Sequence, residues 1–127
     1  MAKTPNNAVL AELPLKPVTF EILLVLAAED LHGYAIVKQL EERSGGSMRL
    51  EPANLYRTLR TLMDRDLIGE ADHPPDQEPN DQRRRYFRIT KFGREVARAE
   101  AARLAKLVEE ARAQQLLRGG GRKGYSG

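Results

Sequence analysis

The side chains best suited to chemistry in this chain are polar and basic groups of the kind that bind nucleic acids. The first group is a row at helical spacing, and it consists of Asn54, Arg57, Thr58, Thr61 and Arg65. Arginine can bind guanine through two donors and asparagine can pair with adenine, so such a row could contact base edges and phosphates. For an isolated helix, an ordinary solvated face is the alternative interpretation.

The second group is a basic run without any acidic residue, and it consists of Arg83, Arg84, Arg85, Arg88 and Lys91. Protecting an edge strand from aggregation needs only one or two charges, so five charges favour contact with nucleic acid. We expect Arg83 and Arg84, which lie nearest to the tip of a hairpin, to reach phosphates or a minor groove.

The same run contains an alternating segment that is typical of a strand. Alternation predicts that Phe87 and Ile89 pack inward, with Arg85 on their face, where it serves the fold. Tyr86 and Arg88 are then expected on the opposite face.

Catalysis is not supported by the residues present. His32 and His73 lie far apart without metal-ligand spacing, and the chain has no cysteine. Residues 44–47 (Ser-Gly-Gly-Ser) lack the Lys-Ser/Thr that completes a phosphate-binding P-loop, so the end of a helix explains them better. We therefore expect no enzymatic activity, no cofactor and no metal site.

Bulk composition predicts one small domain. The chain has 127 residues, of which 41% are hydrophobic and 31% are charged. A core of this size is marginal alone, and dimerisation is a common remedy. The net charge of +3 and the pI near 9.4 permit binding to a polyanion. With no signal-peptide pattern and no apolar run near the roughly 20 residues that span a bilayer, we expect a cytoplasmic protein without membrane association.

Hydrophobic spacing and turn residues predict the elements that position these groups. Residues 1–17 are rich in proline and asparagine and predict a flexible N-terminal arm. Residues 18–30 are apolar on almost every side and predict a buried helix, with room for burial against a second subunit. A second helix follows a turn at His32-Gly33 and ends at Gly45-Gly46.

In this second helix, Tyr34, Val37 and Leu40 recur at helical spacing and are expected to face the core. Residues 48–50 are long enough only for a short strand. A third helix begins at Pro52, because proline suits a first helical turn, and ends near Asp66.

The remaining residues predict a hairpin and a long helix. Residues 67–90 form two strands joined by a long proline-rich tip, and residues 91–117 form a helix without interior proline. Residues 118–127 are a basic, glycine-rich tail that we expect to be disordered. This order is that of a winged helix-turn-helix domain over residues 18–90 (mostly α with a small β-hairpin), followed by a long C-terminal dimerisation helix.

The long helix also carries a seam at heptad spacing, formed by Ala97, Ala101, Leu104, Val108 and Ala111. A seam of about two heptads suits pairing with another helix.

Three motifs together resemble the PadR family of bacterial transcriptional regulators. They are "LHGYAIVKQLEERSGG", "EPANLYRTLRTLMDRDLI" and "RRRYFRITKFGRE", and the resemblance covers roughly residues 18–98. It implies a winged-helix homodimer that binds palindromic operator DNA, usually as a repressor. It also implies dimerisation through the C-terminal helix, aided by Phe20, Leu23 and Leu24 of the first long helix.

The resemblance also implies roles for single residues. The family's tyrosine falls on Tyr56 and its lysine on Lys38, both as DNA-backbone contacts, and the wing arginines fall on 83–85. Asp66 stands where the family usually has glycine, and we expect it to adopt the left-handed conformation at some cost.

Our prediction is that Asn54 and Arg57 contact bases, while Lys38, Tyr56 and Arg60 hold phosphates or sugars. The partners would be double-stranded DNA and a second copy of the chain, with a small aromatic effector at the dimer interface as a further candidate. The alternative is a winged-helix module used for protein-protein interaction.

Overall fold

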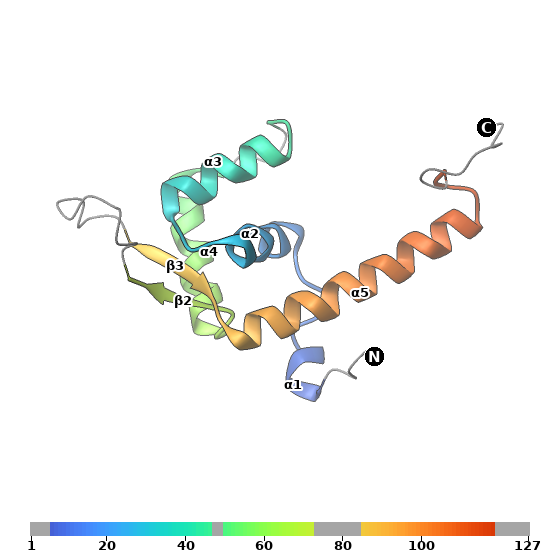
Figure 1. Ribbon diagram of the computed structural model, residues 1–127, viewed down its shortest axis with the longest axis horizontal. Coiled ribbons are helices and arrows are strands. Elements are labelled where there is room, and N and C mark those ends of the chain that lie inside the picture. The colour runs from blue at the N-terminus through green and yellow to red at the C-terminus, as the bar shows by residue number, and fades with distance from the viewer. Residues whose placement is uncertain (1–5, 47–49, 73–84, 119–127) are drawn as a thin grey trace.

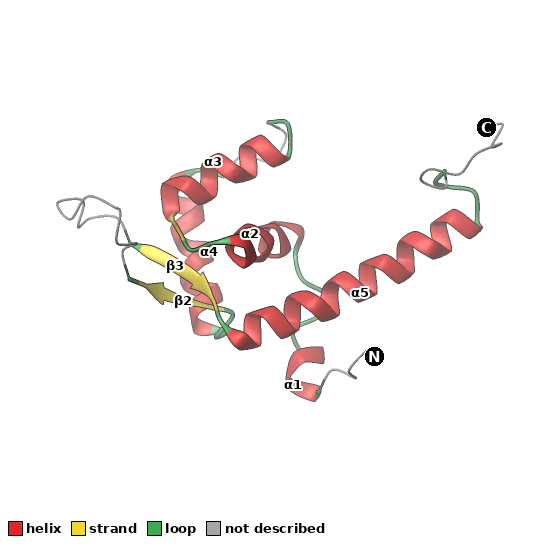
Figure 2. Ribbon diagram, in the orientation of Figure 1, coloured by secondary structure: helices red, strands yellow, loops and turns green. Residues whose placement is uncertain are grey.

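The computed structural model describes residues 6–46, 50–72 and 85–118. Its elements in chain order are α1 (Asn7–Leu10), α2 (Pro17–Ala28), β1 (Leu31–His32), α3 (Gly33–Arg43), α4 (Pro52–Asp64), β2 (Ile68–Ala71), β3 (Tyr86–Ile89) and α5 (Lys91–Ala113). Helices α2, α3 and α4 cluster beside the small sheet, and α5 extends away from this body (Figure 1). The secondary structure is mostly helical, as the sequence predicts (Figure 2). No helix of the described residues is both long enough and apolar enough to cross a membrane.

Helix α2 lies at the centre of the core and packs against α3, α5 and β3. Its side chains Ile22, Leu23 and Leu26 are at most 1% exposed. The helix is apolar on nearly every side because it is covered on nearly every side, as the sequence predicts for this segment. It starts at a proline, whose missing N–H is not needed in a first helical turn.

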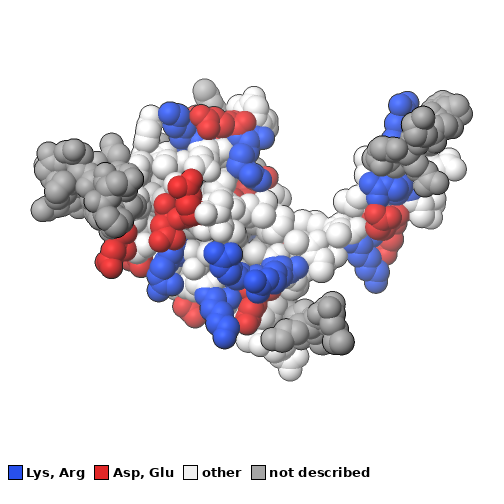
Figure 3. Space-filling model, in the orientation of Figure 1, with Lys and Arg blue, Asp and Glu red and all other residues white. Residues whose placement is uncertain are grey.

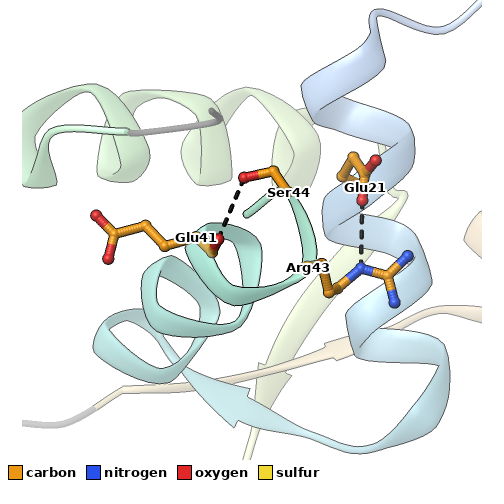
Figure 4. Close-up of polar contacts among 4 residues, drawn as sticks. All are labelled: Glu21, Glu41, Arg43 and Ser44. Atoms are coloured by element: carbon orange, nitrogen blue, oxygen red, sulfur yellow. Dashed lines mark hydrogen bonds and ion pairs between the residues drawn. The ribbon is translucent and has the colours of Figure 1, made fainter. Parts of the chain in front are cut away.

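Helix α3 is joined to α2 by an ion pair between Arg43 Nε and Glu21 Oε1 at 3.3 Å (Figure 4). The helix then ends with Ser44, whose hydroxyl donates to the Glu41 carbonyl at 3.3 Å. Gly45 and Gly46 follow with φ values of +65° and +90°. The predicted glycine stop is thus confirmed, since glycine adopts this left-handed region at little cost.

The sheet has three antiparallel strands in the order β1-β3-β2. The predicted hairpin is confirmed by the pairing of β2 with β3, in which Ile68 faces Ile89 and Glu70 faces Phe87. Its tip, residues 73–84, lies outside the described residues. The third strand is β1, where the sequence predicted a turn, and its two residues are too few to show an alternating pattern. The strand predicted at 48–50 falls largely outside the described residues.

The hairpin and α5 meet at a tightly packed corner. Asp66 has φ +61°, the left-handed conformation expected from the sequence. The Thr90 hydroxyl donates to the Asp66 carbonyl at 2.6 Å and accepts from the Gly93 N–H at 2.8 Å, so it caps α5. A Cβ on Gly93 would lie 2.0 Å from the carbonyl oxygen of Leu67. Only glycine fits here, because α5 rests directly on that peptide group.

Residues 6–16, here called the N-terminal segment, are packed onto the domain. Val9 and Leu15 are 2% and 6% exposed and belong to the core, and α1 contacts α5. The carboxylate of Glu12 accepts a hydrogen bond from Arg65 Nε at 2.7 Å. The prediction of a flexible arm over 1–17 is therefore wrong for residues 6–16. Proline and asparagine mark irregular backbone, but two well-spaced apolar side chains suffice to hold it on a core.

Glu100 of α5 is a buried charged residue against which the N-terminal segment packs. Its side chain is 2% exposed and receives two hydrogen bonds from Arg103, both at 2.8 Å. The hydrogen bonds from Arg103, then its charge and a backbone hydrogen bond from Leu15, lower the pKa of Glu100, although burial opposes them. A Glu-Arg pair at this spacing is typical of an exposed helix face, but here the N-terminal segment packs against the carboxylate of Glu100.

Beyond this point α5 leaves the body. Residues 105–110 are all exposed, and on the face shown in Figure 3 the middle of α5 carries no charged side chains. The helix ends at Ala113, four residues before the predicted end at 117. Gln115, with φ +63°, reverses the chain, and the Leu116 N–H donates to the Ala111 carbonyl at 2.8 Å.

Candidate nucleic-acid interface

Helix α4 separates its apolar and polar side chains onto two faces. Leu55, Leu59 and Leu62 are at most 1% exposed and pack into the core. The predicted contact residues lie on the other face, where all except the half-buried Thr58 are exposed: Asn54, Tyr56, Arg57, Thr58, Arg60 and Thr61. The leucine spacing fixes this outward face, because it fixes which side of the helix is buried.

Two hydrogen bonds order the polar row on α4. Arg57 Nη1 donates to Asn54 Oδ1 at 3.2 Å, one turn along the helix. The Thr61 hydroxyl donates to the Arg57 carbonyl at 3.1 Å, so its proton is directed into the helix. Arg57 and Asn54 thus form one hydrogen-bonding unit at the surface, with donors suited to guanine and an amide suited to adenine.

Arg65 does not belong to this row, contrary to the sequence prediction. It caps the end of α4 and pairs with Glu12 of the N-terminal segment. Periodicity alone places Arg65 on the polar side of α4, but the periodicity does not show that the N-terminal segment returns to that point.

Tyr56 connects α4 to the beginning of α3. A Cβ on Gly33 would lie 2.7 Å from the Tyr56 hydroxyl oxygen, so the tyrosine ring rests against the glycine. Tyr56 nevertheless remains 48% exposed. Gly33 thus allows close approach of the two helices, a role that the interpretation of His32-Gly33 as a turn did not reveal.

The N-terminus of α3 is held by His32. Its Nδ1 accepts from the Ala35 N–H at 3.1 Å, so its side chain caps the helix. Its ring stacks on Tyr34 at 6.3 Å and meets Tyr86 edge-on at 5.3 Å, measured between ring centroids. Tyr34 is 68% exposed, so the prediction that it faces the core is wrong. Lys38, one turn further on, is also exposed.

Tyr86 is 5% exposed, which corrects the expectation that it lies outward with Arg88. Alternation assigned its face correctly, since it pairs with His32 across β1 and β3. What alternation could not show is that β1 adds His32 beside it and covers that face.

The described part of the wing carries two arginines with different environments. Arg85 Nη2 lies 2.6 Å from Glu70 Oε2, and its guanidinium carbon lies 5.6 Å from the centroid of the Phe87 ring. The hydrogen bond from Arg85, reinforced by its charge, lowers the pKa of Glu70. Arg88 Nε instead donates to the Glu70 carbonyl at 3.3 Å. Arg83 and Arg84 lie outside the described residues.

The residues predicted for dimerisation differ in how far their own chain already buries them. Leu23 is 0% exposed within a single chain, so its side chain is already occupied, whereas Phe20 and Leu24 are half-buried. On α5, Ala97 packs partly on the core of its own chain. Ala101 and Val108 are exposed, and Leu104 and Ala111 are half-buried.

Comparison with known proteins assigns the family. The model of the family described as "Transcriptional regulator PadR-like family" matches residues 22–99. The chain belongs to this PadR-like family. Members of this family are DNA-binding transcriptional regulators rather than enzymes. The matched residues include the second part of α2, all of α3 and α4, the hairpin and the first part of α5.

Similar proteins support the fold of this PadR-like chain. A PadR family transcription regulator from Clostridium difficile has a TM-score of 0.63 at 21% identity, covering 80% of this chain and 100% of that one. A transcriptional regulator from Clostridium thermocellum has a TM-score of 0.61 at 19% identity, covering 87% and 97%. An uncharacterised 37.1 kDa transposon protein of Streptomyces fradiae is 36% identical over 86 residues, which are 68% of this chain and 22% of that protein. The chain therefore spans less than a quarter of that relative.

Proposed function

We propose that two copies of this PadR-like chain pair and bind an inverted-repeat operator as a repressor. Each copy places α4 in a major groove, and the two grooves lie about 34 Å apart on the same side of the duplex. Occupying a promoter in this way blocks the polymerase.

The exposed polar face of α4 carries this proposal. Arg57 and Asn54 are hydrogen-bonded to each other at the surface and serve as the base-reading pair. Three further side chains are exposed and serve as contacts to phosphates or sugars: Lys38, Tyr56 and Arg60. Thr58 and Thr61 lie on the same helix face, and the wing arginines 83 and 84 complete the proposed set.

Pairing of two chains is supported by the second half of α5. Leu107 and Val108 are 47% and 40% exposed on a helix that stands clear of the body. Apolar side chains on an isolated helix are stabilised when another helix covers them, and the heptad spacing of Ala101, Leu104 and Val108 suits a helix partner. The half-buried Phe20 and Leu24 of α2 add apolar surface to the same proposal.

Release of the operator is proposed to follow binding of a small aromatic effector between the subunits. Such a ligand would change the angle between the two chains and thereby the spacing of the two α4 helices. The exposed parts of Phe20 and Leu24 support this, because they offer apolar surface without belonging fully to the core.

The first experiment is selection of bound fragments from random duplex DNA, followed by titration of the selected operator and of sheared genomic DNA at two salt concentrations. Arg57→Ala should cost about 1–3 kcal/mol on the operator and much less on genomic DNA, since it removes base contacts. Arg98→Ala, an exposed arginine of α5, is the matched control. Equal loss on both DNAs for Arg57→Ala would remove its base-reading role. No binding at low salt would overturn the proposal in favour of a protein partner.

A further inference from the structure

The ion pair between Glu70 and Arg85 lies where the wing leaves the body. Glu70 is the cross-strand neighbour of Phe87, and Arg85 lies two residues before Phe87 on the same face of the sheet. The two side chains are 57% and 48% exposed, so both remain accessible to solvent and to a ligand. Their contact at 2.6 Å is therefore a surface ion pair rather than part of the core.

Arg85 also adjoins the wing arginines that the proposed function assigns to DNA. Arg85 directly follows Arg83 and Arg84 in the sequence. It therefore continues, along the chain, the run of basic residues that the proposed function assigns to DNA.

We propose that Glu70 competes with DNA for Arg85, its carboxylate occupying in the free protein the position of a backbone phosphate. The inference rests on the proposed function, because it requires α4 and the wing to face DNA. A carboxylate and a phosphate both accept charge-assisted hydrogen bonds from the same planar guanidinium group, so each can replace the other. An exposed ion pair contributes little free energy, so a phosphate can displace the carboxylate. The result is a regulator whose affinity for all DNA sequences is held down by its own side chain.

Arg85 is the target of this competition rather than Arg88. Arg88 donates to the Glu70 backbone carbonyl and lies over Gly69, where a Cβ would come within 3.2 Å of its Nη2. Replacing the Glu70 carboxylate leaves that carbonyl in place. The effect of Glu70 on DNA affinity should therefore depend on Arg85.

A purely structural role for the pair predicts the opposite effect. If Glu70 served only to hold Arg85 over Phe87, its removal would loosen the wing and weaken DNA binding. The sign of the change in affinity separates the two roles.

The test compares Glu70→Gln with Glu109→Gln in the full chain, using a random-sequence duplex and measuring Kd by fluorescence anisotropy over a range of salt concentrations. Glutamine keeps the size of glutamate and removes its charge. Glu109 forms a similar surface pair with Arg112 near the far end of α5, so its variant reports the effect of net charge alone. We expect Glu70→Gln to bind about two- to fivefold more tightly than Glu109→Gln. Its plot of log K against log salt should keep about the wild-type slope, because a phosphate contacts Arg85 in both complexes.

The same substitution in an Arg85→Ala background should give no gain, and thermal unfolding verifies that each variant is folded. An unchanged or weakened affinity of folded Glu70→Gln overturns the inference while the proposed function stands. A gain that persists without Arg85 also overturns it, because Glu70 would then act by repelling phosphate. Failure of the wild-type chain to bind DNA at low salt overturns the proposed function, and this inference with it.

Discussion

Gly93 is the position at which a single added methyl group should cause the largest damage. It lies in the first turn of α5, and a Cβ built on it would lie 2.0 Å from the Leu67 carbonyl oxygen and 3.0 Å from Ile89 Cγ1. The oxygen cannot move freely, because it accepts the Thr90 N–H at 3.1 Å and follows Asp66, whose φ is +61°. We therefore expect Gly93→Ala to force α5 away from the hairpin.

The magnitude follows from this distance. A carbon atom approaches a carbonyl oxygen to about 3.3 Å, so the two elements must separate by more than 1 Å, by roughly 1.3 Å. Overpacking of this kind costs up to about 3 kcal/mol, and the better helix propensity of alanine offsets about 1 kcal/mol of that. The net loss of about 2 kcal/mol corresponds to a fall in Tm of about 8 °C, given the usual entropy of unfolding per residue for a chain of this length.

The assay is thermal unfolding followed by circular dichroism, at one fixed protein concentration because pairing of chains would shift Tm. Gly69→Ala is the matched control: its Cβ would lie 3.2 Å from Arg88 Nη2, the end of a flexible side chain that can move aside. We expect the control to melt within about 2 °C of the wild type. A Gly93→Ala variant that melts as the control does would refute the idea that the Leu67 peptide group fixes the position of α5.

Three further predictions concern the packing of α5 and of the N-terminal segment. Glu100→Gln should destabilise the fold at pH 7. The pKa of Glu100 is lowered below 4.5 in the folded protein, so its carboxylate adds its full share to the free energy of unfolding at any pH above its pKa in the unfolded chain. That share is lost as pH falls through the folded pKa. Urea unfolding should therefore show the difference in free energy of unfolding between wild type and Glu100→Gln shrinking towards pH 3. Arg65→Ala should lower stability by at most about 1 kcal/mol and leave DNA affinity unchanged, since Arg65 pairs with Glu12; a clear loss in a DNA titration would return it to the contact row. Replacing both Leu107 and Val108 by serine should raise the dimer Kd at least about tenfold in light scattering without lowering helix content, and an unchanged Kd would place the interface elsewhere.

The parts of the fold that could be predicted from the sequence are those fixed by local chemistry. The leucine spacing of α4 predicts its buried side and hence its exposed polar row. Pro52 marks where that helix begins, and the Gly45-Gly46 pair marks where α3 ends. The left-handed Asp66 could also be expected, because an aspartate tolerates that conformation better than most residues.

What could not be predicted depends on segments that are distant in sequence. Tyr86 is buried only because β1 places His32 beside it, and two residues give no periodic signal. Glu100 lies on the same face of α5 as the buried Gly93 and Val96, but a charged residue is usually exposed, and the packing of the N-terminal segment against it has no local signal. Burial of a charge usually requires a partner, but Arg103 at i+3 is equally typical of an exposed helix. The burial of both residues is therefore a tertiary effect without a local pattern.

The packing of the N-terminal segment on α5 also has a consequence for biosynthesis. Leu15 and Glu100 are 85 positions apart in the sequence, so the segment cannot dock until most of the chain has been made. At a synthesis rate of 5–20 residues per second, that delay is about 4–17 s, which is long compared with the formation of a helix. During this interval Val9 and Leu15 remain without α5, against which α1 packs. These two apolar side chains are thus made long before the helix against which their segment packs, so they depend on protection while the chain is being synthesised.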